Sequence, residues 1–131
     1  MRELTEALHL GRAPQSALAD LSPTLFAAAH DGDMVAAGLV DRQAEEIVLM
    51  VTCALRGLAL LESEVPVVLG GGVLAARDPR LMGGITTGLA QVAPFARITL
   101  VTAPPIVGAA ALALDAVGRS AAALHVAATT T

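Results

Sequence analysis

A short apolar run that ends in three glycines constrains the fold of this chain more than any other feature. Residues 66–69 read Pro-Val-Val-Leu and are followed by Gly70, Gly71 and Gly72. Apolar residues without polar alternation are typical of a strand that is buried on both faces, as in a parallel sheet. A second run, from Arg97 to Val101, follows after one helical stretch. A strand, a helix and a strand in this order predict a right-handed crossover and a parallel pair.

Helical patterns precede, connect and follow the two runs. Ser22 and Asp78 each place a capping side chain directly before a proline, which is a helix start. Asp33 is followed by apolar residues at steps of three and four, the period of an amphipathic helix. The expected helices span residues 23–30, 34–58, 79–93 and 104–117.

The longest of these helices has an apolar stripe and a charged face. Its expected stripe comprises Val40, Ala44, Ile47, Val51, Ala54 and Leu58, widened by Val48 and Leu55. On the other face, Arg42 and Glu46 are four residues apart and are placed to form an ion pair. In the helix after Asp78, the glycines at 83, 84 and 88 are each expected to cost about 1 kcal/mol relative to alanine.

The order helix, helix, strand, helix, strand, helix predicts the α/β class, with a short parallel β-α-β unit. Two strands alone form a poor sheet. We therefore expect either that further strands come from elsewhere or that the chain is cut from a larger protein. An uncovered sheet edge and apolar helix faces favour association, so a homo-oligomer is expected.

The composition excludes several classes of protein. Hydrophobic residues make up 55% and charged residues 15%, which argues against a disordered chain. The net charge of −4 and the 2% of aromatic residues argue against the basic surface and the aromatic stacking residues that bind nucleic acids. The longest internal run without charge, between Arg97 and Asp115, is shorter than the roughly 20 apolar residues that span a bilayer. Charged residues precede any apolar run at the N-terminus, unlike a signal peptide. A soluble cytoplasmic protein without nucleic-acid or membrane partners is expected.

The glycine turn is the strongest candidate for a binding site. In open α/β sheets, ligands bind beyond the carboxyl ends of the strands. Glycines at that place let a phosphate or a sugar approach the backbone without meeting a side chain. The turn has neither the G-x-G-x-x-G spacing nor a Walker A lysine. A tight connection from strand to helix also needs glycine, so both interpretations remain open.

Other polar residues give weaker signals. The acidic side chains of Asp41, Glu45 and Glu46 form either a solvated helix face or the border of a ligand cleft. Cys53, the single cysteine, excludes an internal disulfide and is expected to be a small core residue. Arg77 is either exposed or a phosphate ligand. The three histidines lie at 9, 30 and 125, with no spacing typical of metal ligands, and no Ser-His-Asp constellation is recognisable.

Several of these segments together resemble a known family. Residues 67–73 (VVLGGGV), followed by Arg77-Asp78-Pro79, resemble the adenosine motif of actin-like sugar kinases. Residues 104–110 (PPIVGAA), followed by Leu112 and Leu114, resemble their closing helix. With residues 21–33 and the long helix, residues 16–118 are similar to the C-terminal part of bacterial N-acetylglucosamine kinases of the BadF/BadG/BcrA/BcrD ATPase family.

This resemblance implies a ribonuclease H-like, actin-like ATPase lobe over residues 16–118. Residues 1–15 would be a poorly defined N-terminal segment and residues 119–131 a frayed tail. The family binds ATP with Mg²⁺ between two lobes and phosphorylates a sugar. Gly70, Gly71 and Gly72 would contact ribose and α-phosphate, while Asp41 and Glu45 would lie near the adenine.

The chain also departs from the family. It has no D-G-G-x-T phosphate loop and no recognisable catalytic aspartate, and Met82-Gly83-Gly84 replaces better helix formers. We therefore expect a C-terminal fragment or a truncated reading frame, inactive alone, with no catalytic and no metal-ligating residue of its own. The alternative is a non-catalytic, self-associating interaction domain. A small membrane-associated helical protein is a third reading, which Pro104-Pro105 opposes because prolines interrupt a helix.

Overall fold

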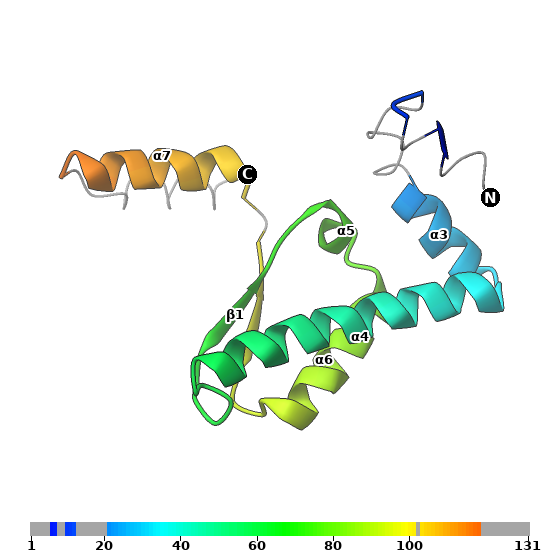
Figure 1. The fold of residues 1–131 in the computed structure, drawn as a ribbon, viewed down its shortest axis with the longest axis horizontal. Coiled ribbons are helices and arrows are strands. Elements are labelled where there is room, and N and C mark those ends of the chain that lie inside the picture. Colours follow the sequence, from blue (N-terminus) through cyan, green and yellow to red (C-terminus); the bar gives the residue numbers. More distant parts are fainter. Residues whose placement is uncertain (1–5, 8–9, 13–20, 102, 119–131) are drawn as a thin grey trace. The chain divides into compact units, whose positions relative to one another are not determined.

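The computed structural model describes residues 6–7, 10–12, 21–101 and 103–118 (Figure 1). The chain divides into two compact units, Met1–Leu100 and Val101–Thr131, and each is described by itself. Most of the N-terminal segment, residues 1–15, lies outside the described residues. The tail at 119–131 and the boundary at residue 15 lie outside them entirely.

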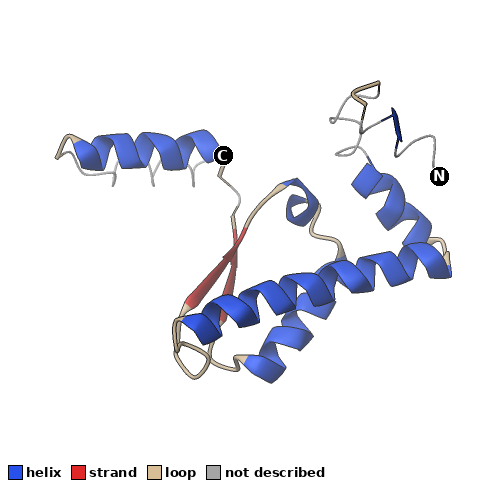
Figure 2. Ribbon diagram, in the orientation of Figure 1, coloured by secondary structure: helices blue, strands red, loops and turns tan. Residues whose placement is uncertain are grey.

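The described part of the first unit is mixed α/β and rich in helix (Figure 2). Its elements are α3 (Leu21–His30), α4 (Met34–Gly57), β1 (Pro66–Leu69), α5 (Gly72–Ala75), α6 (Pro79–Val92) and β2 (Arg97–Leu100). The predicted helices and both strands are confirmed to within one or two residues at their ends. The short helix α5 was not expected. α3 begins at Leu21, so Ser22 lies within its first turn rather than before it.

The two strands form a parallel pair, as predicted. Val67 lies opposite Ile98 and Leu69 opposite Leu100, and these four side chains join the hydrophobic core with the helices. The expectation that β1 is buried on both faces is wrong, because its side chains alternate and Val68 is 61% exposed. The helices of this unit pack against one face of the sheet only, the face to which Val67 and Leu69 point.

The core is built mainly where α4 and α6 cross. Leu81, Ile85 and Leu89 of α6 and Val40 of α4 are the largest fully buried side chains. The predicted core-facing surface of α4 is confirmed for Val40, Ala44, Ile47 and Leu55, which are buried, and for Val48 and Val51, which pack against the core. It is wrong for Ala54 and Leu58, which are exposed. Because an α-helix has 3.6 residues per turn, Leu55 rather than Ala54 or Leu58 lies on the side of α4 that faces the core.

Two glycines allow α4 and α6 to approach closely. A Cβ atom at Gly84 would lie 2.8 Å from the Cβ of Ala44, and one at Gly88 would lie 2.7 Å from Cγ2 of Val48. Both distances are too short for real side chains. Gly84 and Gly88 therefore weaken α6 as an isolated helix but are required for its packing.

The predicted caps and ion pair of α4 are present. The carboxylate of Asp33 accepts hydrogen bonds from the backbone N–H groups of Val35 and Ala36, at 2.8 and 3.0 Å. Arg42 pairs with Glu46, with 2.6 Å between Nη2 and Oε1.

The described part of the second unit contains α7 (Pro105–Ala116), which follows Pro104 as predicted. Ile106 and Leu112 are exposed on this helix, and Gly118 adopts a φ of 71° just beyond its end. Among the described residues, no helix combines the length and the apolar character needed to cross a membrane.

Candidate functional site

The glycine turn lies directly after the carboxyl end of β1. Gly70, Gly71 and Gly72 are all exposed, and Gly72 is the first residue of α5. Gly71 has φ 114° and ψ 162°, a backbone conformation that is essentially restricted to glycine. In Figure 2 this turn is the loop that links the first strand to the small helix α5.

Packing among the described residues explains neither of the last two glycines of this turn. A Cβ atom built on Gly71 or Gly72 meets no other atom within 4 Å. Gly71 is required by its positive φ, but Gly72 is not among the glycines with positive φ. The fold therefore requires glycine at 71 and leaves the absence of a side chain at 72 unexplained.

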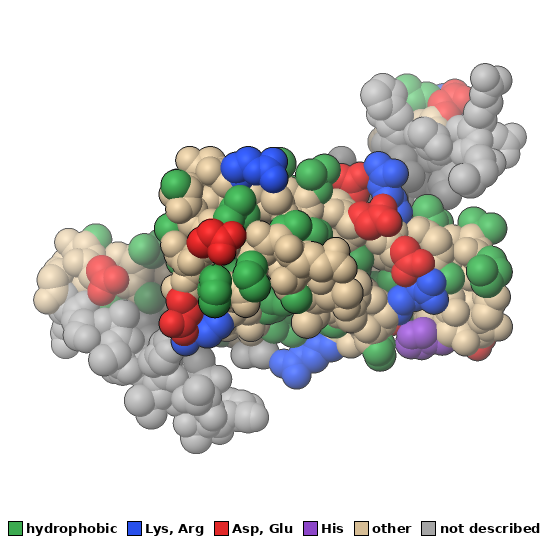
Figure 3. All heavy atoms as spheres, turned by 90° about the horizontal axis from the view of Figure 1, so that it is seen from below, with side chains coloured by type: hydrophobic (Ala, Val, Ile, Leu, Met, Phe, Trp, Pro, Cys, Tyr) green, Lys and Arg blue, Asp and Glu red, His purple; other side chains and the backbone are tan. Residues whose placement is uncertain are grey.

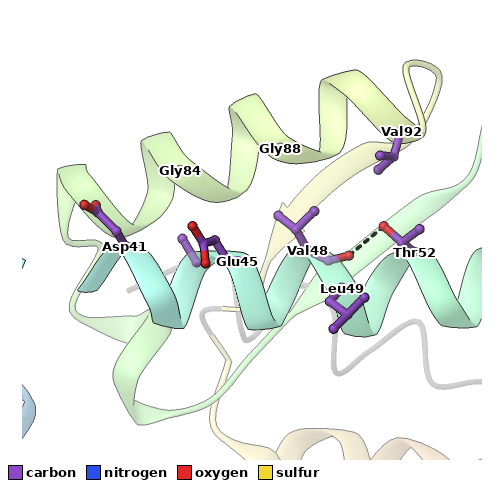
Figure 4. Close-up of a pocket in the computed structure, with 9 residues that line it drawn as sticks. Asp41, Glu45, Val48, Leu49, Thr52, Gly84, Gly88 and Val92 are labelled. Atoms are coloured by element: carbon purple, nitrogen blue, oxygen red, sulfur yellow. Dashed lines mark hydrogen bonds between the residues drawn. The ribbon is translucent and has the colours of Figure 1, made fainter. Parts of the chain in front are cut away.

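Asp41 and Glu45 border a separate pocket of about 540 Å³ between α4 and α6. The pocket is lined by Asp41, Ala44, Glu45, Val48, Leu49 and Thr52 of α4 and by Gly84, Gly88 and Val92 of α6. Figure 4 shows the two carboxylates at one end, while Val48 points toward α6 and Leu49 points away from it. The pocket is thus an apolar surface with acidic groups at one side.

The Asp41 carboxylate is held by an arginine. Arg80, in the first turn of α6, donates from Nε and Nη2 to the two carboxylate oxygens, at 2.7 and 2.6 Å. These hydrogen bonds, and secondarily the positive charge of Arg80, lower the pKa of Asp41. The same hydrogen bonds raise the pKa of Arg80. Among the described residues Glu45 forms no ion pair, so its carboxylate is the less engaged of the two.

The structure brings only some of the predicted site residues together. Asp41 and Glu45 share the pocket between α4 and α6, whereas Glu46, the third acidic residue of the cleft interpretation, is not among the residues that line it. Gly70, Gly71 and Gly72 are not among the residues that line it. The predicted site thus consists of two distinct surfaces, a glycine turn and an apolar pocket.

Asp78 caps α6 and also contacts a second helix. Its Oδ1 accepts from the backbone N–H of Leu81 at 2.9 Å, which confirms the predicted cap. Its Oδ2 lies 2.9 Å from Nε2 of His30, at the end of α3. Asp78 is buried, and its carboxylate connects the start of α6 with the end of α3. Arg77, next to it, is exposed and has φ 50°.

Cys53 does not line the pocket between α4 and α6, and the described residues contain no candidate metal centre. Cys53 is exposed, so its expected place in the core is wrong; it lies on the face of α4 opposite the buried residues. Within the described ranges, no group of three or more histidine, cysteine, aspartate or glutamate side chains is placed to hold a metal ion. His9 and His125 lie outside these ranges.

Sequence reasoning missed two contacts between α4 and α6 at the pocket. The first is the ion pair between Arg80 and Asp41, which are far apart in sequence and carry no local signal. The second is the pairing of two glycines four residues apart on α6 with Ala44 and Val48, also four apart on α4. The Gly-x-x-x-Gly spacing was visible in the sequence and is typical of closely packed helices.

Comparison of the chain with protein-family models, with curated proteins and with solved structures gives no match. The geometry of the described residues and the resemblance of its motifs are therefore the basis for a functional proposal.

Proposed function

We propose that the chain is the C-terminal, adenosine-binding part of an ATP-dependent sugar kinase similar to N-acetylglucosamine kinases of the BadF/BadG/BcrA/BcrD ATPase family. Its β-α-β unit would belong to a ribonuclease H-like lobe of the actin-like ATPase type. The parallel pair of β1 and β2, with a helical crossover between them, is compatible with such a lobe.

The glycine turn is the observation that carries this proposal. It follows the carboxyl end of a parallel strand, where α/β proteins bind their ligands. Gly72 has no side chain although neither its φ nor a neighbouring atom demands this. Close approach of a ribose or an α-phosphate to the backbone would account for it.

The two surfaces would serve different parts of the nucleotide. Gly70, Gly71 and Gly72 would contact ribose and α-phosphate, and Mg²⁺ would be carried by the phosphates of ATP rather than by this chain. The pocket between α4 and α6 has the volume and the apolar lining of small-molecule sites. Glu45 could accept a hydrogen bond from the amino group of adenine, whereas the Asp41 oxygens are engaged by Arg80.

Phosphoryl transfer would need more than this chain provides. Such transfer requires a positioned γ-phosphate and a base that accepts the proton of the sugar hydroxyl. No described residue is proposed as that base. We therefore expect no turnover by the isolated chain with ATP, Mg²⁺ and N-acetylglucosamine. Robust turnover in a coupled assay would contradict the proposal that this chain binds adenosine but lacks the catalytic groups.

Titration with ATP and Mg²⁺, followed by amide chemical shifts, tests the binding step. Half of a cleft makes only part of the contacts, so we expect a dissociation constant in the millimolar range, roughly −4 kcal/mol. Gly72→Val should abolish the shifts of the turn. Gly83→Ala is the matched control, because Gly83 is exposed on α6 and a Cβ there also meets nothing within 4 Å.

Two outcomes would contradict the proposal. Equal binding by Gly72→Val and by the wild type would place the nucleotide elsewhere. The absence of chemical-shift changes at millimolar ATP would contradict nucleotide binding altogether. Glu45→Gln tests the pocket separately. If the nucleotide reaches this pocket, Glu45→Gln should weaken binding while shifts at the glycine turn persist.

A second candidate function is a self-associating interaction domain without nucleotide affinity. It is favoured by large hydrophobic side chains that are exposed on α4, including Met34, Val35 and Met50. On the face drawn in Figure 3, hydrophobic side chains likewise reach the surface between acidic and arginine side chains. Concentration-dependent association combined with no response to ATP would favour this candidate.

A further inference from the structure

The side of α4 that faces away from the core carries a continuous row of exposed side chains. Hydrophobic members of this row are well exposed: Val35 at 74%, Leu39 at 55%, Leu49 at 56% and Met50 at 61%. The charged pair of Arg42 and Glu46 lies between them. We name as the α4 stripe the residues Val35, Gly38, Leu39, Arg42, Glu46, Leu49, Met50 and Cys53.

Helical geometry places these residues on one face. At about 100° per residue, the eight positions lie within an arc of about 120°. The buried residues of α4, such as Val40, Ala44 and Ile47, lie on the opposite side. The α4 stripe is therefore not an extension of the core but a second apolar face of the same helix.

The α4 stripe is symmetric in sequence about Ala44. Arg42 and Glu46 lie at equal distances before and after this residue, and so do Leu39 and Leu49. Gly38 and Met50 form the next pair, and Val35 and Cys53 the outermost one. The two inner pairs are complementary, an arginine with a glutamate and two leucines, and the two outer pairs contain only uncharged residues.

We infer that a second copy of this chain binds the α4 stripe, with the two α4 helices antiparallel and crossing near Ala44. A two-fold axis makes residue i of one copy face residue j of the other, and residue j face residue i. Under this symmetry Leu39 faces Leu49 of the second copy, and Arg42 faces its Glu46. Both charged pairs are then opposite in sign, the leucines meet one another, and Met50 faces Gly38, which has no side chain.

A hollow beside the stripe provides room for side chains of the second copy. A pocket of about 440 Å³ is lined by Leu21, Leu25 and Ala28 of α3, with Leu39 of α4 and the polar Ser22 and Thr24 at its border. The pairing places Leu49 of the second copy against Leu39 and hence next to this pocket. The stripe comprises eight residues, fewer than the roughly 20–30 per side of a standard interface. We therefore expect a dimer that dissociates at about micromolar concentration.

This inference rests on self-association and not on nucleotide binding. The inference specifies the surface, the partner and the register of the dimer. The homo-oligomer expected from an uncovered sheet edge specified none of these. Its failure is also separable from that of the proposed function, because the residues substituted to test nucleotide binding, Gly72 and Glu45, are not in the α4 stripe. The stripe shares only Leu49 with the pocket between α4 and α6.

Cross-linking tests the register directly with the single native cysteine. In the proposed dimer, position 35 of one copy faces Cys53 of the other. Within one chain the two positions are 18 residues apart on a helix, or about 27 Å, beyond the reach of a short bismaleimide. We expect the full-length Val35→Cys variant to give a covalent dimer, and the wild type to give none because its two cysteines are equally far apart.

Val68→Cys is the matched control for random collision. Val68 is 61% exposed, comparable with Val35, but lies on β1 outside the α4 stripe. We expect it to give no covalent dimer at the same concentration. Equal dimer yields from the two variants, or none from Val35→Cys, would overturn the proposed register.

Charge reversal tests the surface independently of cross-linking. Arg42→Glu and Glu46→Arg each place like charges opposite one another in the dimer, so each should raise its dissociation constant at least about tenfold in sedimentation equilibrium. The two single variants, when mixed, present only opposite charges to each other and should form a heterodimer. The double variant should recover the wild-type dissociation constant to within about threefold.

A purely local role of the ion pair predicts a different pattern. In that case the single variants would lose the bond between the two residues within α4, and mixing them would restore nothing. All variants are checked for unchanged helix content by circular dichroism, because these residues are exposed or half-buried. A wild-type chain that is monomeric at all concentrations, or a mixture without heterodimer, would contradict the inference.

Discussion

Two regions of the first unit depend on pairs of glycines for opposite reasons. At the α4–α6 crossing, a Cβ on Gly84 or Gly88 would lie within 2.8 Å of a side-chain atom of α4. At the turn after β1, a Cβ on Gly71 or Gly72 would meet only open space. Glycine is thus fixed by packing in the first region. In the second it is fixed by backbone conformation at 71 and by nothing within the described chain at 72.

The largest expected effect on stability comes from adding a side chain where α4 and α6 cross. Gly84→Ala gains helix propensity, but its Cβ collides with the Cβ of Ala44, which has no rotamer to change. Overpacking of this kind costs about 1–3 kcal/mol. We expect the free energy of unfolding to fall by about 2 kcal/mol, measured by urea denaturation.

The neighbouring glycine supplies the matched control for this substitution. Gly83 is exposed, and a Cβ there meets nothing within 4 Å. Gly83→Ala should therefore stabilise the unit by about 0.5–1 kcal/mol through helix propensity alone. If both alanine variants were stabilised equally, the close approach of the two helices would be wrong.

Most of the secondary structure could be predicted because its signals are local. Asp33 and Asp78 mark the starts of α4 and α6, because their carboxylates accept hydrogen bonds from backbone N–H groups in the first turn of each helix. The apolar run before Gly70 marks β1. Burial was predicted less well, since which faces of β1 and α4 are covered depends on the number of layers in the unit. The exposure of Val68 illustrates this.

The candidate site could be predicted only in part, for the same reason. The position of the glycine turn after a strand follows from the sequence around it. That Asp41 and Glu45 border a pocket follows from the crossing of α4 with α6, and the Asp41–Arg80 ion pair joins residues from two helices. Such contacts are set by tertiary packing and leave no local pattern.

Asp78 lies between the two regions in the chain, after the glycine turn and α5 and directly before α6. Asp78→Ala removes the cap from Leu81 N–H and the partner of His30 together. Loss of a cap alone costs about 0.5–2 kcal/mol, so we expect a loss of about 1–2 kcal/mol by urea denaturation. His30→Ala should cost less, because it leaves the cap intact. An equal loss in both variants would assign the stabilisation to the His30 contact rather than to the cap.

Substitutions in the glycine turn should separate conformation from function. Gly71→Ala forces a side chain into φ 114°, a strained conformation that costs about 1–3 kcal/mol; we expect the low end because this exposed turn can relax. Gly72→Ala should leave the melting temperature nearly unchanged, since its Cβ meets only solvent. Thermal denaturation of the two variants side by side is the measurement. Strong destabilisation by Gly72→Ala would give this glycine a structural explanation and remove the main support for a ligand at the turn.

The smallest expected effect concerns the charged end of the α4–α6 crossing and depends on pH. Hydrogen bonds from Arg80 lower the pKa of Asp41 from its ordinary value of 3.8. A carboxyl group whose pKa is lowered by folding stabilises the fold above its unfolded pKa, and this contribution is lost as the pH falls through the folded pKa. Asp41→Asn should therefore lower the melting temperature slightly at neutral pH, and the difference from the wild type should shrink as the pH falls below 3.8 and through the lowered pKa of Asp41. Arg80→Gln removes the same bond from the other side and should show the same convergence. A difference that persists in acid for both variants would mean that these side chains support the crossing by packing, as the glycines do, and not by charge.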